Sequence, residues 1–200
     1  VSPDGKTLAP SLAQSGIRQP ESLMQRMSVA LAAWGKAVYD AELKPVITSE
    51  TSEVAALQKA VRLTGELRVK EADGDLIKLL EREKLTPAVR GAALEALSAL
   101  SSKNAIKQLA ALARKDDAAA IKALDKTTPA GAELLLDEMT DKDGRFYYFA
   151  YASATKACGI RDGKPRGFFE NSKPDFYTKE LDRVRTVVRE RAKGWRDENE

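Results

Sequence analysis

Apolar side chains recur along this chain at intervals of three and four residues, the spacing that places them on one face of an α-helix. Between residues 54 and 139 these stretches follow one another with short breaks, and the breaks contain residues that cap helices. Thr86-Pro87 and Thr128-Pro129 each place a capping residue before a proline in the first helical turn, where its missing N–H costs no hydrogen bond. The pattern predicts an all-α protein.

A further helix is expected before this region. From Glu21 onward, apolar residues that include Trp34 and Val38 fall at helical spacing. Pro45 is expected to end this element, because proline lacks the N–H that a helix interior requires. Residues 1–20 contain three prolines and two glycines without a sustained period, so they are expected to form an irregular lead-in.

The predicted helices recur in pairs. The equivalent apolar positions are Leu67, Leu97 to Leu100 and Leu124 in the first helices, and Ile77, Ile106 and Leu134 in the second helices. Helix pairs that recur about every 30 residues indicate stacked antiparallel hairpins, an α-solenoid, because a single hairpin cannot bury its apolar face alone. The region from 21 to 140 is therefore expected to be a helical-repeat region.

One of these pairs carries a family resemblance. The string PAVRGAALEAL at 87–97, followed by AIKQLAAL at 105–112, resembles a HEAT repeat of the bacterial type, one of the armadillo-type α-solenoids. The likeness is strong over 86–113, whereas the neighbouring pairs match only in helix length and apolar spacing. An Ala-rich helical bundle of another kind would also fit that spacing. The positions that carry the resemblance are Pro87, Val89, Arg90, Ala93, Leu97, Ile106 and Leu109.

Arg90 is a charged residue in a helix built almost wholly from Ala and Leu. Its long stem can cover a neighbouring helix pair while its guanidinium binds a carboxylate. Glu95, Asp116 and Asp117 are the available acids, so a tie between repeats is expected rather than an active-site charge.

The segment from 141 to 200 differs in composition, since ten of the twelve aromatic residues lie between Phe146 and Trp195. Residues 145–159 are expected to form a helix with aromatic side chains on several faces, followed by an ordered loop. A last helix is expected from about Asp175 to Trp195. This segment is predicted to pack on the last repeat as a helical cap within a single structural domain.

Cations and aromatic residues are interleaved in this loop, at Arg161, Lys164, Arg166, Phe168 and Phe169. Such a mixture is typical of surfaces that bind phosphate backbones and stack on bases. It is equally typical of an ordered loop anchored by its aromatic residues, or of a protein-binding surface. These five residues are the candidate partner-binding positions.

Composition excludes most catalytic chemistry. The chain has no histidine, which removes the commonest general base and zinc ligand, and one cysteine, Cys158, which is expected to be an inert thiol. DKDG at 141–144 lacks the first ligand and the bidentate acid of an EF-hand, so a turn is expected there. No catalytic, metal-binding or cofactor-binding residue is predicted.

The residues and the resemblance together predict a non-enzymatic scaffold that binds a protein partner on a groove lined by second helices, or on the C-terminal segment. The alternatives are a nucleic-acid-binding repeat protein that uses the basic C-terminal segment, and an accessory protein of the lyase type found among bacterial HEAT proteins. The net charge is only +3, and no apolar run is long enough to span a membrane. A soluble protein is therefore expected. Its compartment stays open between cytoplasm and export, since no signal peptide is visible in a chain that starts at Val1, and a single cysteine cannot form an internal disulfide.

Overall fold

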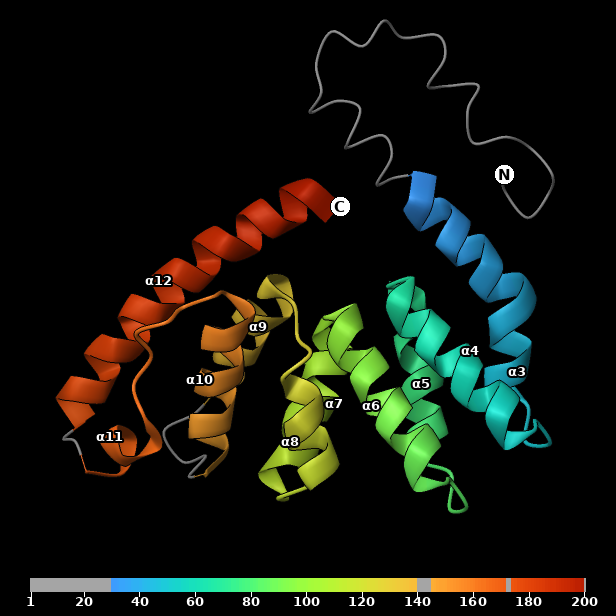
Figure 1. Ribbon diagram of the computed structural model, residues 1–200, viewed down its shortest axis with the longest axis horizontal. Coiled ribbons are helices and arrows are strands. Elements are labelled where there is room, and N and C mark those ends of the chain that lie inside the picture. Colours follow the sequence, from blue (N-terminus) through green and yellow to red (C-terminus); the bar gives the residue numbers. More distant parts are fainter. Residues whose placement is uncertain (1–29, 140–144, 172–173, 200) are drawn as a thin grey trace, which may run out of the picture.

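The computed structural model of the chain describes residues 30–139, 145–171 and 174–199 (Figure 1). All regular secondary structure within these ranges is helical, which confirms the all-α prediction. The expected lead-in at 1–20, the first turns of the expected helix at 21–29 and the acidic turn at 141–144 lie outside the described residues.

The elements follow one another with short connections. After a helix at residues 30–38 they are η1 (Tyr39–Leu43), α3 (Lys44–Thr48), α4 (Val54–Glu66), η2 (Lys70–Ala72), α5 (Asp73–Leu80), α6 (Pro87–Leu100), α7 (Lys103–Arg114), α8 (Ala118–Leu124), α9 (Pro129–Asp137), α10 (Arg145–Ala157), α11 (Arg166–Asn171) and α12 (Pro174–Asn199).

The first helix continues through Pro45, so the prediction that this proline ends it is wrong. η1 is a π-helical turn, in which the N–H of Lys44 donates to the carbonyl of Tyr39. This turn shifts the hydrogen-bonding register directly before the proline, and Pro45 falls in the first turn of α3, where no N–H is needed. The chain therefore remains helical from residue 30 to Thr48.

Capping side chains begin the helices where the sequence predicts them. The hydroxyl of Thr86 accepts from the N–H of Val89 at the start of α6, and that of Thr128 accepts from the N–H of Gly131 in α9. Asp117 caps α8. Each cap satisfies backbone donors that a helix start leaves free, so these helix boundaries are determined locally.

The helices form two rows. α4 packs on α6 and α6 on α8 in the first row, while α5 packs on α7 and α7 on α9 in the second row. Val89, Ala93 and Leu97 of α6 and Ile106 and Leu109 of α7 are buried in the core that the rows share, whereas Pro87 is exposed.

Additional helices cover both ends of the rows. At one end, Tyr39, Leu43 and Ile47 are buried where η1 and α3 pack on α4 and α5. At the other end, α10 and α12 pack on α9. Leu181, Val184 and Val188 of α12 are buried. The expected loop after α10 contains a short helix, α11, so it is only partly a loop.

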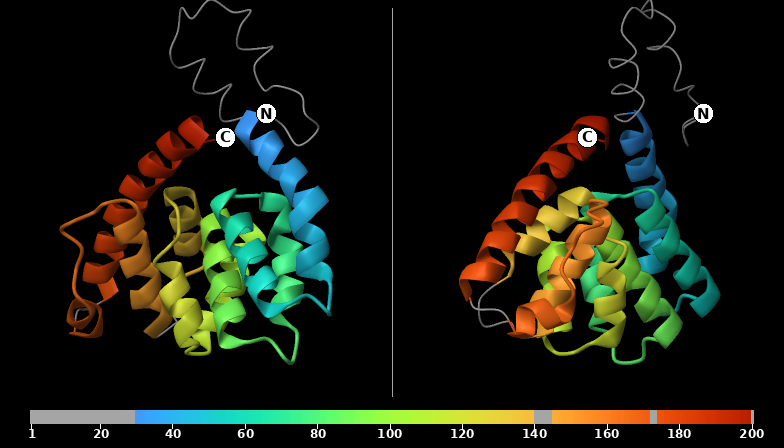
Figure 2. Two further views of the ribbon diagram at one scale, coloured as in Figure 1. Left: turned by 45° about the vertical axis from the view of Figure 1, so that its right-hand side comes forward. Right: turned by 60° about the vertical axis from the view of Figure 1, so that its left-hand side comes forward.

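The two ends of the described chain approach each other. In Figure 1 and in both views of Figure 2, the C-terminal end of α12 lies beside the beginning of the helix at 30–38. Trp195 near the end of α12 and Trp34 near the beginning of the first helix line the same cavity. This arrangement brings residues from opposite ends of the sequence together above α4 and α6.

Candidate interaction site

Arg90 forms the predicted tie between helix pairs. Its Nη2 lies 2.5 Å from Oδ2 of Asp117 and its Nη1 lies 3.3 Å from Oδ1. The same carboxylate accepts from the N–H groups of Ala119 and Ala120, so it caps α8 while it binds α6. The hydrogen bond from Arg90 holds the pKa of Asp117 below its ordinary value. Arg90 therefore has a stabilising role, as the sequence indicates.

The five candidate partner-binding residues are brought together, but not as a uniform surface. Arg161, Lys164 and Arg166 are exposed, whereas Phe168 and Phe169 are half-buried. The ring of Phe169 lies 4.6 Å from that of Tyr151, centroid to centroid, and also contacts Tyr147 and Tyr148.

Phe169 therefore anchors the segment to α10. The cations beside it are also engaged within the chain. Arg166 pairs with Glu170 at 2.6 Å, and the ammonium of Lys164 lies 5.9 Å from the ring centroid of Phe168. These contacts fit the interpretation of an ordered segment held by its aromatic residues.

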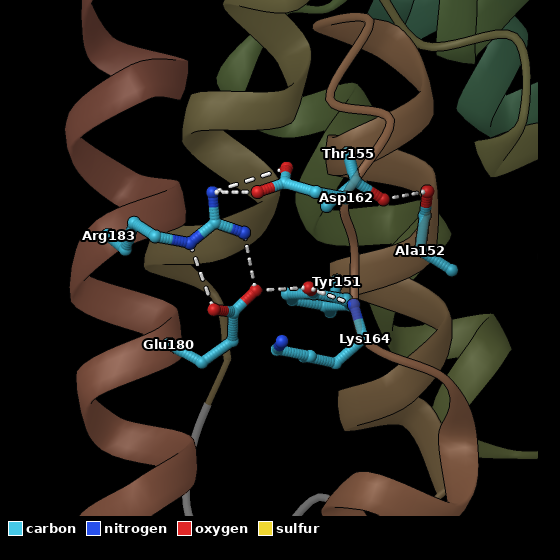
Figure 3. Close-up of polar contacts among 7 residues, drawn as sticks. All are labelled: Tyr151, Ala152, Thr155, Asp162, Lys164, Glu180 and Arg183. Atoms are coloured by element: carbon cyan, nitrogen blue, oxygen red, sulfur yellow. Dashed lines mark hydrogen bonds and ion pairs between the residues drawn. The ribbon is translucent and has the colours of Figure 1, made fainter.

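A polar network attaches this segment to α12 (Figure 3). The hydroxyl of Tyr151 donates to Oε1 of Glu180 at 2.6 Å and accepts from the backbone N–H of Lys164 at 2.7 Å. Arg183 donates to both oxygens of Glu180, at 2.9 and 2.8 Å. Its Nη1 also lies 3.0 Å from Oδ2 of Asp162. Three parts of the chain, namely α10, the loop after it and α12, are thereby joined.

The electrostatics of this network are those of a structural clamp. Burial, reinforced by the hydrogen bond to Glu180, raises the pKa of Tyr151 to about 12. The guanidinium of Arg183 holds the pKa of Glu180 below its ordinary range, and that carboxylate raises the pKa of Arg183. Tyr151 thus stays protonated and Glu180 ionised near neutral pH. Neither group is poised to exchange a proton at that pH.

Catalytic and metal-binding chemistry finds little support in the described ranges. Burial raises the pKa of Cys158 to about 11, which disfavours the nucleophilic thiolate. Within these ranges no three acidic or cysteine side chains are grouped so that they could hold a metal ion. None of the helices described there combines the length and apolar character that a membrane crossing requires.

An apolar cavity of about 590 Å³ lies between the first helix, the end of α4 and the end of α12, and we call it the tryptophan cleft. Its apolar lining includes Leu31 and Trp34 of the first helix, Leu67 at the end of α4, Leu100 of α6 and Trp195 of α12. Leu31 is 56% exposed, which is unusual for a leucine beside other large apolar side chains. The cleft contains both tryptophans of the chain.

A second cavity of about 440 Å³ continues from the cleft, since Glu66 and Arg68 line both. We call it the alanine groove, because Ala92, Ala96 and Ala99 of α6 form its floor. α4 lines its other side. Both cavities are bordered by α4 and α6, and thus lie elsewhere than the groove of second helices that the sequence predicts as a docking surface.

The chain matches no known family model, no curated protein sequence and no solved structure. The geometry of the cleft is therefore the basis for a functional conclusion. Two half-buried tryptophans and an exposed leucine provide apolar area that a partner can cover, and Trp is enriched among the residues that dominate binding energy. Sequence reasoning missed this site because its tryptophans come from opposite ends of the chain.

Proposed function

We propose that this chain is a HEAT-like α-solenoid that serves as a non-enzymatic scaffold and binds a protein partner in the tryptophan cleft. The cleft is the observation on which the proposal depends. Its lining is apolar, open to solvent and bordered by charged residues, which is the composition expected of a protein-binding patch.

The packing of the helix pairs supports the solenoid part of the proposal. Each row is formed by contacts between a helix and its counterpart in the next pair. Polar ties recur at nearly the same separation along the chain: Arg90 to Asp117 over 27 residues, Thr128 to Ser101 over 27, and Ser102 to Asp73 over 29. Contacts that repeat at one-repeat intervals are the expected product of stacked, similar units.

The basic C-terminal segment is a weaker candidate for the binding surface. Nucleic-acid binding would require free aromatic faces beside the cations, but Phe169 packs on Tyr151 and Arg166 binds Glu170. No cluster of catalytic groups in the described ranges favours an enzyme. These observations favour the tryptophan cleft over the C-terminal segment as the binding surface.

The proposal is tested by comparing two apolar-to-acidic substitutions. Leu31→Glu places a charge in the cleft. Val54→Glu makes the same kind of change at the first residue of α4, at the end of that helix away from the cleft. The two side chains have similar exposure, 56% for Leu31 and 49% for Val54. Full-length wild-type and variant chains are used to capture partners from a lysate, and each captured protein is then purified and titrated directly by calorimetry.

We expect a partner whose affinity falls at least tenfold with Leu31→Glu and less than twofold with Val54→Glu, because only the first substitution buries a charge on binding. Thermal melts of both variants check that the fold is intact. A partner that binds both variants equally well would show that the cleft is not its site. A partner weakened only by reversal of Arg161 and Lys164 would move the function to the C-terminal segment.

A further inference from the structure

We infer that the occupant of the tryptophan cleft and alanine groove is an acidic amphipathic helix of the partner protein. The inference rests on the proposed function, since it specifies the chemistry of the partner. Three properties of the two cavities support it: the backbone that borders them, the size of the side chains on their floor, and the sign of the charge at their edges.

The backbone around the cavities favours a helical occupant. The lining residues come from the helix at 30–38, from α4, α6 and α12, and from the short connections after α4 and α8. Backbone groups inside helices are already hydrogen-bonded, so these helices offer no edge on which an extended peptide could pair. A helix brings its own backbone hydrogen bonds and needs only side-chain contacts.

The floor of the alanine groove permits close approach. Ala92, Ala96 and Ala99 lie one turn apart along α6 and present only methyl groups, while the exposed Glu95 lies beside them. α4 and α6 are themselves in tight contact at this point, since a Cβ on Gly65 would lie 2.9 Å from Cα of Ala96. A third helix can therefore lie over the seam between α4 and α6, with its larger apolar residues reaching Trp34 and Trp195 in the cleft.

The charge at the edges favours acidic flanks on that helix. Five of the residues that line the two cavities are Lys or Arg and three are Glu. Arg62 and Lys126 are exposed at the alanine groove, and their side chains form no hydrogen bond or ion pair with the described residues. Carboxylates of an incoming helix can pair with these two cations without displacing an existing partner.

The test uses two designed 18-residue helical peptides with the same Leu and Phe stripe, one flanked by Glu and the other by Lys. The full-length protein is titrated with each peptide, and its tryptophan emission reports binding, because both tryptophans line the cleft and the peptides contain none. We expect the Glu peptide to bind at least tenfold more tightly at low salt, and this preference to shrink as salt screens the charges.

Charge reversal locates the effect. Arg62→Glu combined with Lys126→Glu should abolish or invert the preference for the Glu peptide. The control combines Lys103→Glu with Lys107→Glu, which makes the same change of charge on exposed residues of α7 and should leave the preference intact. Circular dichroism melts of both double variants verify folding.

Equal binding of the two peptides, tighter binding of the Lys peptide, or a preference that survives reversal of Arg62 and Lys126 would each overturn the inference. So would sedimentation velocity that shows a dimer sensitive to Leu31→Glu, since a second copy would then occupy the cleft. A captured partner that depends on Leu31 but binds through a basic or extended segment would refute this inference alone. Absence of any Leu31-dependent partner would instead refute the proposed function.

Discussion

Tyr151→Phe removes a single oxygen from the clamp between α10, its following loop and α12. That oxygen makes two hydrogen bonds, to the carboxylate of Glu180 and from the backbone N–H of Lys164. The ring remains and can keep its contact with Phe169. A hydrogen bond to a charged group contributes about 1.5–3 kcal/mol and a neutral one about 1 kcal/mol. Because Glu180 keeps Arg183, we expect a loss of about 2 kcal/mol of unfolding free energy.

The pH dependence gives this prediction a second, independent measurement. The pKa of Tyr151 is raised by folding, from an ordinary value of about 10 to about 12, so the folded state holds the phenolic proton more tightly than the unfolded state. Its contribution to stability is therefore complete below pH 10 and is lost as the pH rises from 10 to 12. Tyr151→Phe has no such proton, so its stability should fall less over that range.

Chemical denaturation at pH 7 and at several values between pH 9 and 12 measures both effects. Tyr148→Phe is the matched control, because Tyr148 also packs on Phe169 but its hydroxyl forms no hydrogen bond with the described residues. A double-mutant cycle with Glu180→Gln isolates the coupling between the two side chains. If Tyr151→Phe and Tyr148→Phe unfold at the same denaturant concentration and with the same pH profile, the clamp contributes nothing and the reasoning is refuted.

The remaining predictions concern the repeat region and the cap. Arg90→Ala should lower the free energy of unfolding by about 1 kcal/mol, measured with urea, and should leave the affinity for a partner in the cleft unchanged. Loss of partner binding in a stably folded variant would contradict this prediction. Because folding lowers the pKa of Asp117, the stability that its carboxylate contributes is present above its unfolded pKa of about 4 and is lost at lower pH. The difference in melting temperature between wild type and Arg90→Ala should therefore narrow below about pH 4. Gly131→Ala would place a Cβ 2.3 Å from Oγ1 of Thr127 and should lower the free energy of unfolding by about 1–3 kcal/mol. At Gly91, in the interior of α6, a Cβ would point into open space, so Gly91→Ala should raise the free energy of unfolding by about 0.5–1 kcal/mol. Equal melting temperatures of the two variants would refute this contrast. Deleting residues 145–200 should lower the melting temperature by exposing α9, and an unchanged melt would show that these residues do not act as a cap.

Local signals in the sequence account for much of the fold. Thr86 and Thr128 begin helices because a hydroxyl before a proline satisfies the first turn, and these choices depend only on neighbouring residues. The partner of Arg90 could also be predicted from the sequence, since Asp117 follows 27 residues later, just before the next predicted helix. The continuation of the first helix through Pro45 could not be predicted in this way, because the π turn that accommodates the proline depends on packing of Tyr39 and Leu43 against later helices.

The binding site and the clamp depend on contacts that no local pattern reveals. Glu180 is only 7% exposed on a helix whose composition is highly charged. Arg183 is a local partner three residues later, but Tyr151, which donates to the same carboxylate, comes 29 residues earlier in the chain. The same holds for Trp34 and Trp195, which line one cavity because α12 packs along α9. The periodicity of the chain predicts which residues enter a core, but not which distant elements meet at its surface.

α12 contributes both to the packing at one end of the rows and to the cleft. α12 buries Leu181, Val184 and Val188 at the end of the rows, and its last turns continue toward the beginning of the helix at 30–38 (Figure 1). There Arg196 binds Glu133 of α9 at 2.8 Å, and the guanidinium of Arg68 lies 5.2 Å from the ring centroid of Trp195. Contacts that hold α12 in place therefore also form one wall of the cleft. A partner helix that covers Trp195 would gain from this preorganisation, because the wall is already ordered before binding.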